Sequence, residues 1–116
     1  QTNEVSNYLE IDNGVVDEEN EKMLREVFPK SIPEEATEIT YDYFYGAGDF
    51  SISILAKWKL PYEIYNEYRN DYKSTELKKT GNAYIYTEYS DTTTCFCSVI
   101  FYDDNQMIEY KFQQDN

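Results

Sequence analysis

Residues 39–60 of this chain read ITYDYFYGAGDFSISILAKWKL, which contains two runs of alternating apolar and polar side chains. Because successive side chains of a β-strand point to opposite faces of a sheet, this period predicts two strands. Gly46-Ala47-Gly48 separates the runs and is followed by Asp49, which would repel phosphate, so it predicts a hairpin turn. The apolar face of the second run consists of Phe50, Ile52, Ile54, Ala56, Trp58 and Leu60.

The length of this turn decides which side chains meet, because a slip of one residue exchanges the two faces of a strand. A two-residue loop would pair Tyr43 with Phe50 and Tyr41 with Ile52. A four-residue loop would pair Tyr45 with Phe50 and Tyr43 with Ile52. Both bring the apolar sets together, whereas a three-residue loop would separate them, so we expect an even loop.

Two helices are predicted, one before and one after this hairpin. Asp17 is a candidate N-cap with three glutamates in the turn that follows it, and Pro29 ends the first helix. Pro61 is well placed to open the second helix. The apolar stripes are Met23, Leu24, Val27 and Phe28 in the first helix, and Ile64, Tyr65, Tyr68 and Tyr72 in the second.

The last third of the chain predicts three more strands after a basic connector at Lys73–Thr80. Asp104-Asn105 suits a two-residue hairpin turn, because both residues tolerate positive φ. That turn would set Phe101 opposite Ile108 and Val99 opposite Tyr110. The expected strands are Ala83–Tyr89, Thr93–Tyr102 and Gln106–Phe112.

The order α-β-β-α-β-β-β predicts an α+β fold with a single antiparallel sheet of about five strands. We expect both helices to pack on one face of the sheet. Residues 1–16 have no sustained period and are expected to form a flexible N-terminal lead, followed by one domain at 17–116. The other face of the sheet should carry Ser51, Ser53, Lys57, Lys59 and some of the tyrosines.

The composition excludes several classes of function. The 116 residues include thirteen tyrosines, no histidine, and 23 acidic against 10 basic side chains, for a net charge of −13. Without histidine the chain lacks the commonest general base and metal ligand, and its charge should repel nucleic acid. The acidic excess lies at the two ends of the chain, whereas residues 39–80 are balanced.

No pattern of residues predicts a catalytic, cofactor or metal site. Cys95 and Cys97 would share one face of a strand, and we expect two buried free thiols in the sheet core. Two cysteines cannot complete a tetrahedral metal site. Residues 12–18 only faintly match a calcium loop, since the closing glutamate is missing. Adjacent acidic residues are expected in solvated turns and helix ends.

Tyrosine is the residue type most suggestive of binding, because it offers apolar area and a hydroxyl at little entropic cost. Most tyrosines of this chain follow strand or helix periods and are expected to be structural. The candidates for a binding surface are Tyr62 on the second helix and Tyr84 and Tyr86 on the third strand.

The segment from Phe28 to Ala36, FPKSIPEEA, leads into a tyrosine-rich strand. This arrangement resembles small exported lipoproteins of Gram-positive bacteria. The resemblance covers about a tenth of the chain and implies no catalytic residue. It implies an exported protein whose signal segment and lipid-bearing cysteine would lie upstream of Gln1.

Three functional hypotheses follow. The first is a non-enzymatic, exported or membrane-tethered domain that binds an unknown protein or small ligand, with no transmembrane segment in this chain. The second is a cytoplasmic, immunity-type inhibitor that neutralises a basic toxin by charge complementarity. The third is an acid–base enzyme, which would require a pocket holding two carboxylates, or a carboxylate and a tyrosine hydroxyl, with perturbed pKa values.

Overall fold

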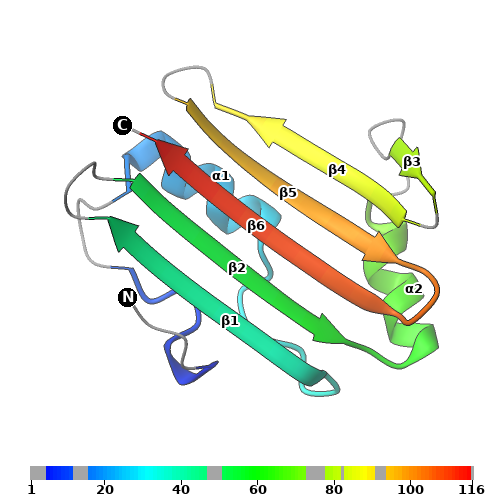
Figure 1. Cartoon of the computed structure of the whole chain (residues 1–116). Coiled ribbons are helices and arrows are strands. Elements are labelled where there is room, and N and C mark those ends of the chain that lie inside the picture. The colour runs from blue at the N-terminus through cyan, green and yellow to red at the C-terminus, as the bar shows by residue number, and fades with distance from the viewer. Residues whose placement is uncertain are drawn as a thin grey trace.

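The predicted hairpin forms two neighbouring strands at one edge of a single antiparallel sheet (Figure 1). These strands are β1 (Thr37–Gly46) and β2 (Ser51–Lys59), and Gly46 lies opposite Ser51. Four residues separate this last pair, so the prediction of an even loop is confirmed. The computed structural model describes residues 5–11, 16–46, 51–72, 78–81, 83–90 and 94–115.

The apolar sets of β1 and β2 meet in neither predicted register: the pairs are displaced by two residues from those of the four-residue loop and by four from those of the two-residue loop. Tyr45 lies opposite Ile52, and Tyr43 lies opposite Ile54. The predicted partner Phe50 falls outside the described residues. Because the displacement is even, every side chain keeps its face, and the tyrosines of β1 remain on the same side as the isoleucines of β2.

The sheet has six strands rather than about five, in the order β1-β2-β6-β5-β4-β3 (Figure 1). The additional strand is β3, which the sequence pattern assigned to a connector, and it pairs with the first residues of β4. Three residues are too few to display a period of two, which is why the pattern missed it. The four remaining strands are β3 (Lys78–Thr80), β4 (Ala83–Tyr89), β5 (Thr94–Tyr102) and β6 (Met107–Asp115).

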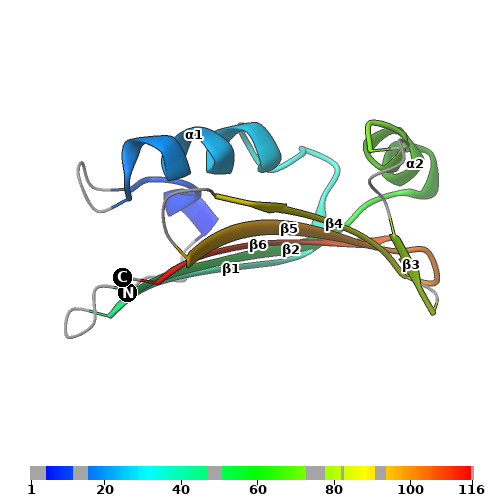
Figure 2. The ribbon, with the colours of Figure 1, turned by 90° about the horizontal axis from the view of Figure 1, so that it is seen from above.

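The two helices lie on the same face of the sheet, as predicted (Figure 2). Helix α1 (Glu18–Val27) extends across the sheet, and α2 (Tyr62–Asn70) lies at the end where β5 turns into β6 (Figures 1 and 2). A short 3-10 helix, η1 (Val5–Asn7), precedes them and contacts β1. The fold is therefore α+β, with one helical layer and one open sheet face.

The core lies between the sheet and the helices. Trp58, Tyr110 and Phe28 connect the two layers, with ring centroids 5.2 Å apart for Trp58 and Tyr110 and 5.5 Å for Phe28 and Tyr110. The core also includes two residues of the predicted N-terminal lead, Leu9 and Val16. The strand side chains of the core are Tyr41, Ile52, Ile54, Ala56, Trp58, Cys95, Cys97, Val99, Phe101, Ile108, Tyr110 and Phe112.

The hairpin of β5 and β6 has the predicted register, with Phe101 opposite Ile108 and Val99 opposite Tyr110. Its turn differs from the prediction. The last pair is Tyr102 and Met107, so four residues connect the strands instead of two. Gln106, rather than Asp104 or Asn105, has the positive φ, at 57°. Its side chain donates to the Asp103 carbonyl oxygen over 3.1 Å, which stabilises the wider turn.

Strand β6 continues three residues beyond its predicted end because Gln114 is buried and hydrogen-bonded. Its Oε1 accepts from the Asn20 side chain over 2.8 Å and from the Asp17 N–H over 3.3 Å. Asp17 occupies the predicted N-cap position, but its side chain makes no capping hydrogen bond. A glutamine from the sheet therefore binds the start of α1.

Cys95 and Cys97 are buried free thiols on the helix-facing side of β5, as predicted. Burial raises the pKa of the Cys95 thiol from 9.0 to about 11, with smaller contributions from Asp17 and Asp115. Burial also raises the pKa of Cys97. Both groups are therefore protonated and unreactive near neutral pH.

Candidate functional site

Tyrosine hydroxyls from two distant segments bind carbonyls at and just beyond the end of α1. Such carbonyls lack partners within their own helix. The Tyr72 hydroxyl, just beyond α2, donates to the Val27 carbonyl oxygen over 3.0 Å. The Tyr8 hydroxyl donates to the Pro29 carbonyl oxygen over 2.7 Å. The Tyr72 contact joins the ends of α1 and α2, and the Tyr8 contact ties the N-terminal segment to the residues after α1.

A cavity of about 360 Å³ lies between these two helix ends. We call it the helix-end groove. Tyr110 of β6 is one of its buried lining residues. The groove combines aromatic rings with two carboxylates, and its lining residues include neither lysine nor arginine. They are Glu26, Val27, Phe28, Pro29, Tyr68, Asp71, Tyr72 and Tyr110.

Both charged residues that line the groove are acidic. Glu26 belongs to the last turn of α1, and Asp71 directly follows α2. Arg25 is the nearest cation in sequence to Glu26, and it pairs with Glu21 over 3.9 Å on the same helix. Among the described residues, neither groove carboxylate takes part in an ion pair.

The groove tyrosines are neutral. Burial raises the pKa of Tyr72 to about 12, with Tyr86 and Asp71 adding to the effect. Burial, followed by the carboxylates of Glu35 and Asp71, raises the pKa of Tyr68. Tyr110, the most deeply buried, also has its pKa raised well above the usual value. Each ring therefore presents an uncharged face whose π-electrons attract cations.

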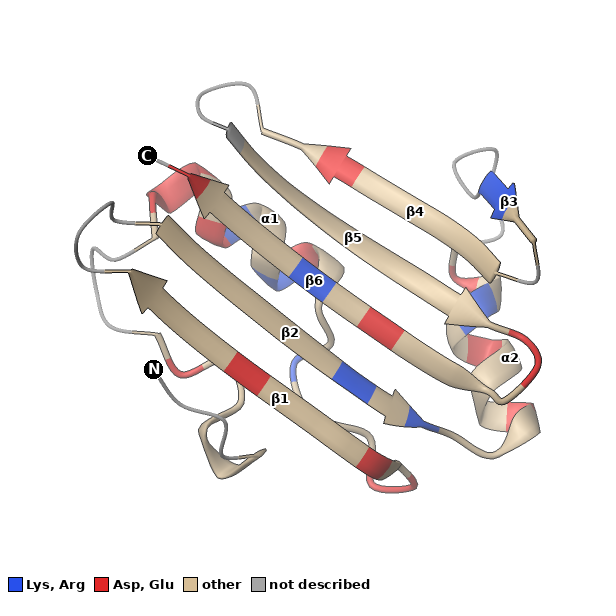
Figure 3. Ribbon diagram, in the orientation of Figure 1, with Lys and Arg blue, Asp and Glu red and all other residues tan. Residues whose placement is uncertain are grey.

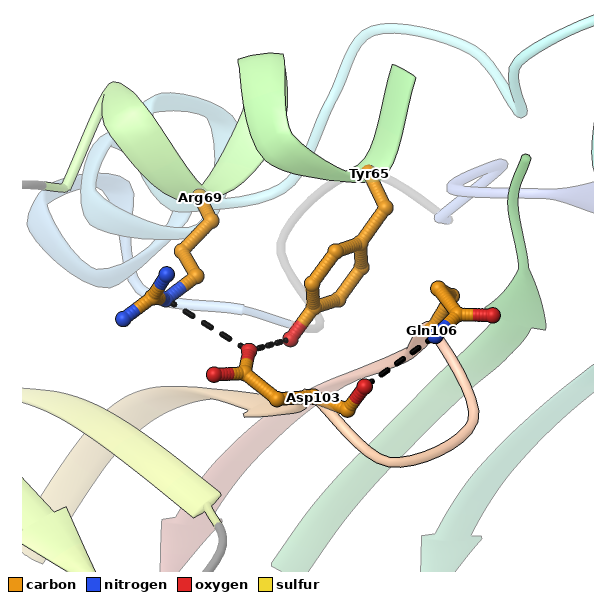
Figure 4. A network of polar contacts seen from close by, with 4 residues as sticks. All are labelled: Tyr65, Arg69, Asp103 and Gln106. Carbon is orange, nitrogen blue, oxygen red and sulfur yellow. Dashed lines mark hydrogen bonds and ion pairs between the residues drawn. The ribbon is translucent and has the colours of Figure 1, made fainter. Parts of the chain in front are cut away.

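A second polar cluster fixes α2 to the turn between β5 and β6 (Figure 4). The Tyr65 hydroxyl donates to Asp103 Oδ1 over 2.5 Å, and Arg69 Nε lies 3.6 Å from the same oxygen. The Arg69 guanidinium also stacks on the ring of Tyr84, 3.9 Å from the centroid. A carboxylate and an aromatic face thus hold one arginine side chain.

Two carboxylate–tyrosine hydrogen bonds of the kind that acid–base chemistry would need occur among the described residues. One, from Tyr102 to Glu109, spans 3.5 Å in a cavity on the open face of the sheet. The other, from Tyr65 to Asp103, spans 2.5 Å. Burial and the hydrogen bond to Asp103 raise the pKa of Tyr65, which makes its hydroxyl a weaker acid. Neither residue lines the helix-end groove. The contact is suited to anchoring α2 rather than to transferring a proton to a bound substrate.

The open face of the sheet contains a second cavity, of about 380 Å³. Lysines and glutamates alternate around it, with Lys57 opposite Glu109 across the β2–β6 pair. Glu109 also pairs with Lys111 over 3.1 Å and accepts a 3.5 Å hydrogen bond from Tyr102. Because two lysines and two glutamates line it, the cavity has no dominant charge.

The predicted binding residues occupy three different environments. Tyr62 begins α2 and is 64% exposed. Tyr84 lies under Arg69, and Tyr86 packs on Tyr72 with ring centroids 5.3 Å apart. Tyr62 and Arg69 are seven residues apart on α2, about 10 Å along the helix axis, so Tyr62 lies away from the other two. Their role in binding stays a prediction.

The residues of the helix-end groove were not identified from the sequence, which assigned Tyr68 and Tyr72 to the core. Both do pack against the core, but each also lines the groove. The available signal was the i, i+3, i+4 spacing of Tyr68, Asp71 and Tyr72, which places a carboxylate between two rings at a helix end. Glu26 and Tyr110 are brought there only by folding.

Neither a metal site nor a membrane-spanning helix is found within the described ranges. No three acidic or cysteine side chains among these residues are grouped to hold a metal ion. None of the helices in the same residues is long and apolar enough to cross a bilayer. No protein-family model, curated protein or solved structure matches this chain.

Proposed function

We propose that the protein is a non-enzymatic binding module that docks a positively charged protein with its helix-bearing side. The chemistry of the groove supports this role, because neutral tyrosine rings and free carboxylates favour cations. The net charge of −13 would steer such a partner toward the module at a rate that falls with salt.

The observation that carries the proposal is the unequal charge of the two sides. Residues 17–27 contain five acidic and two basic side chains, and residues 61–71 contain three and one, a net charge of −5 over both helices with their flanking residues Asp17 and Asp71. Acidic residues mark both helices in Figure 3. On the open sheet face, Lys57, Lys59, Lys78 and Lys111 balance Glu38, Asp42, Glu109 and Asp115.

An immunity-type inhibitor of a basic toxin is the more specific form of this proposal, and the acidic helical side favours it. The exported or membrane-tethered location is a separate proposal that rests on the resemblance of residues 28–36. Fractionation of the source cells would test the location: recovery of the intact protein with the cytoplasm would contradict export.

Binding of a blocked oligo-arginine peptide, measured by calorimetry at low and at physiological salt, tests the proposed docking side. Glu63→Gln/Glu67→Gln on α2 should weaken binding by about threefold, equivalent to about 0.7 kcal/mol. The matched control Asp42→Asn/Asp115→Asn makes the same charge change on the open sheet face and should have little effect. Equal losses in both variants, or no binding by the natural protein, would contradict the proposal.

A further inference from the structure

The helix-end groove combines three independent sources of negative potential. The first is the pair of carboxylates, Glu26 and Asp71, which both line the cavity. The second is the geometry of the helices: α1 ends at Val27 and α2 at Asn70, so both C-terminal ends meet here. Each helix end carries a partial negative charge that favours cations within the last turn.

Aromatic faces are the third source. Tyr68 and Tyr72 line the groove from α2 and the residues after it, and Tyr110 lines it from the sheet. Tyr72 is held in place by its hydrogen bond to Val27 and by packing on Tyr86. A cation that enters would therefore meet preorganised rings, at a low cost in side-chain entropy.

The same molecule shows how these groups hold an arginine. Arg69 lies between the ring of Tyr84, 3.9 Å from its centroid, and the carboxylate of Asp103, 3.6 Å from its Nε. The groove offers the same two groups, tyrosine rings and carboxylates, without an arginine or lysine among its lining residues. Guanidinium is also the basic group that stacks best on aromatic faces and loses its hydration most easily.

We infer that the helix-end groove is the anchor site for an arginine side chain of the partner protein. This inference rests on the proposed function and adds the position and chemistry of its central contact. The guanidinium would stack on the ring of Tyr68 and pair with Asp71 and Glu26. A basic partner would thus be recognised by one buried arginine, while the other helix carboxylates steer its approach.

Charge-matched variants test the site with the oligo-arginine peptide. Glu26→Gln/Asp71→Asn should lower affinity at least about tenfold, against about threefold for Glu63→Gln/Glu67→Gln outside the groove. Tyr68→Leu should lower affinity about fivefold without changing the net charge, because it removes the aromatic face. Tyr68→Phe keeps that face and should bind as the natural protein does. An oligo-lysine peptide should bind more weakly than oligo-arginine.

The outcomes separate this inference from the proposed function. Equal losses in the two double variants, or unchanged binding in Tyr68→Leu, would overturn the groove as the arginine site while binding to the helical side still stood. Equal affinity for oligo-lysine would overturn the preference for arginine. Absence of binding by the natural protein would overturn both proposals. Urea unfolding of each variant checks that it is folded. If Tyr68→Leu does not fold, the comparison of Glu26→Gln/Asp71→Asn with Glu63→Gln/Glu67→Gln still tests the groove.

Discussion

At the scale of single residues, tyrosine joins the apolar core to polar groups at its boundary. A buried hydroxyl without a partner would cost free energy, so each ring can be buried only where its oxygen finds one. Tyr8 and Tyr72 donate to backbone carbonyls, and Tyr65 donates to Asp103. The Tyr41 oxygen instead accepts from the Leu9 N–H over 3.1 Å. This use explains why the chain is rich in tyrosine rather than phenylalanine.

Tyr65→Phe should lower the free energy of unfolding by about 1–3 kcal/mol, because it removes a buried hydrogen bond to a charged group. Tyr62→Phe on the same helix is the matched control. Since Tyr62 is 64% exposed, its substitution should change stability by less than about 0.5 kcal/mol. Urea denaturation of both variants measures the difference, and equal stabilities would show that the Tyr65–Asp103 contact contributes nothing.

At the scale of elements, short helices depend on partners outside themselves. Helix α1 has ten residues, which is marginal for an isolated helix. Gln114 of β6 binds the first turn of α1. Tyr72 binds the carbonyl of its last residue, Val27, and Tyr8 binds a carbonyl two residues further on. The ends of α1 are therefore defined by the sheet and by α2 as much as by its own sequence.

Strand β1 is irregular near its start. Its register shifts between Thr37 and Thr40, and Glu38 has a φ of 51°. This left-handed conformation costs a residue with a Cβ about 1–2 kcal/mol, and glycine adopts it freely.

Glu38→Gly should therefore be more stable than Glu38→Ala by about 1 kcal/mol, the reverse of the usual order in strands. Both variants remove the same carboxylate, so the comparison isolates the backbone. Thermal unfolding of the pair measures the difference. A more stable alanine variant would mean that the strand does not require a left-handed residue at this position.

At the scale of the whole molecule, burial raises the pKa values of several tyrosine hydroxyls and of both cysteine thiols. The pKa of Tyr72 rises from 10.0 to about 12, and that of Cys95 from 9.0 to about 11. Burial likewise raises the pKa values of Tyr8, Tyr65 and Tyr110. Above the unfolded values, the folded state holds protons that the unfolded state has lost, so stability falls as pH rises.

The stability contributed by these groups should be complete below about pH 9 and should be lost progressively between about pH 9 and 12. We expect tyrosinate absorbance to appear cooperatively and together with loss of the circular dichroism signal. The free-tyrosine titration near pH 10 serves as the reference. Ionisation of all thirteen tyrosines near that pH with an intact dichroism spectrum would contradict the burial of the tyrosine core.

Much of the sheet could be predicted, because hairpin registers follow from local alternation. The β5–β6 register matched the predicted pairs, and the bounds of β4 matched as well. The prediction failed where local pattern is weak. Strand β3 is too short to show a period, and the last part of β6 is polar because Gln114 binds α1. The groove as a whole could not be predicted, because its lining residues lie far apart in the chain: residues 26–29, Tyr68, Asp71, Tyr72 and Tyr110.

The sequence by itself determined the strand faces, the two helices, the buried thiols and the acidic charge without histidine. These properties follow from composition and from periods that each segment carries alone. Only the tertiary structure decided where the charge and the tyrosines act. It placed both helix ends beside Tyr110 and left the groove carboxylates unbalanced by lining cations, while lysines and carboxylates face one another on the open sheet. These contacts depend on how distant segments pack together. Several folds with the same local patterns would pack those segments in different ways.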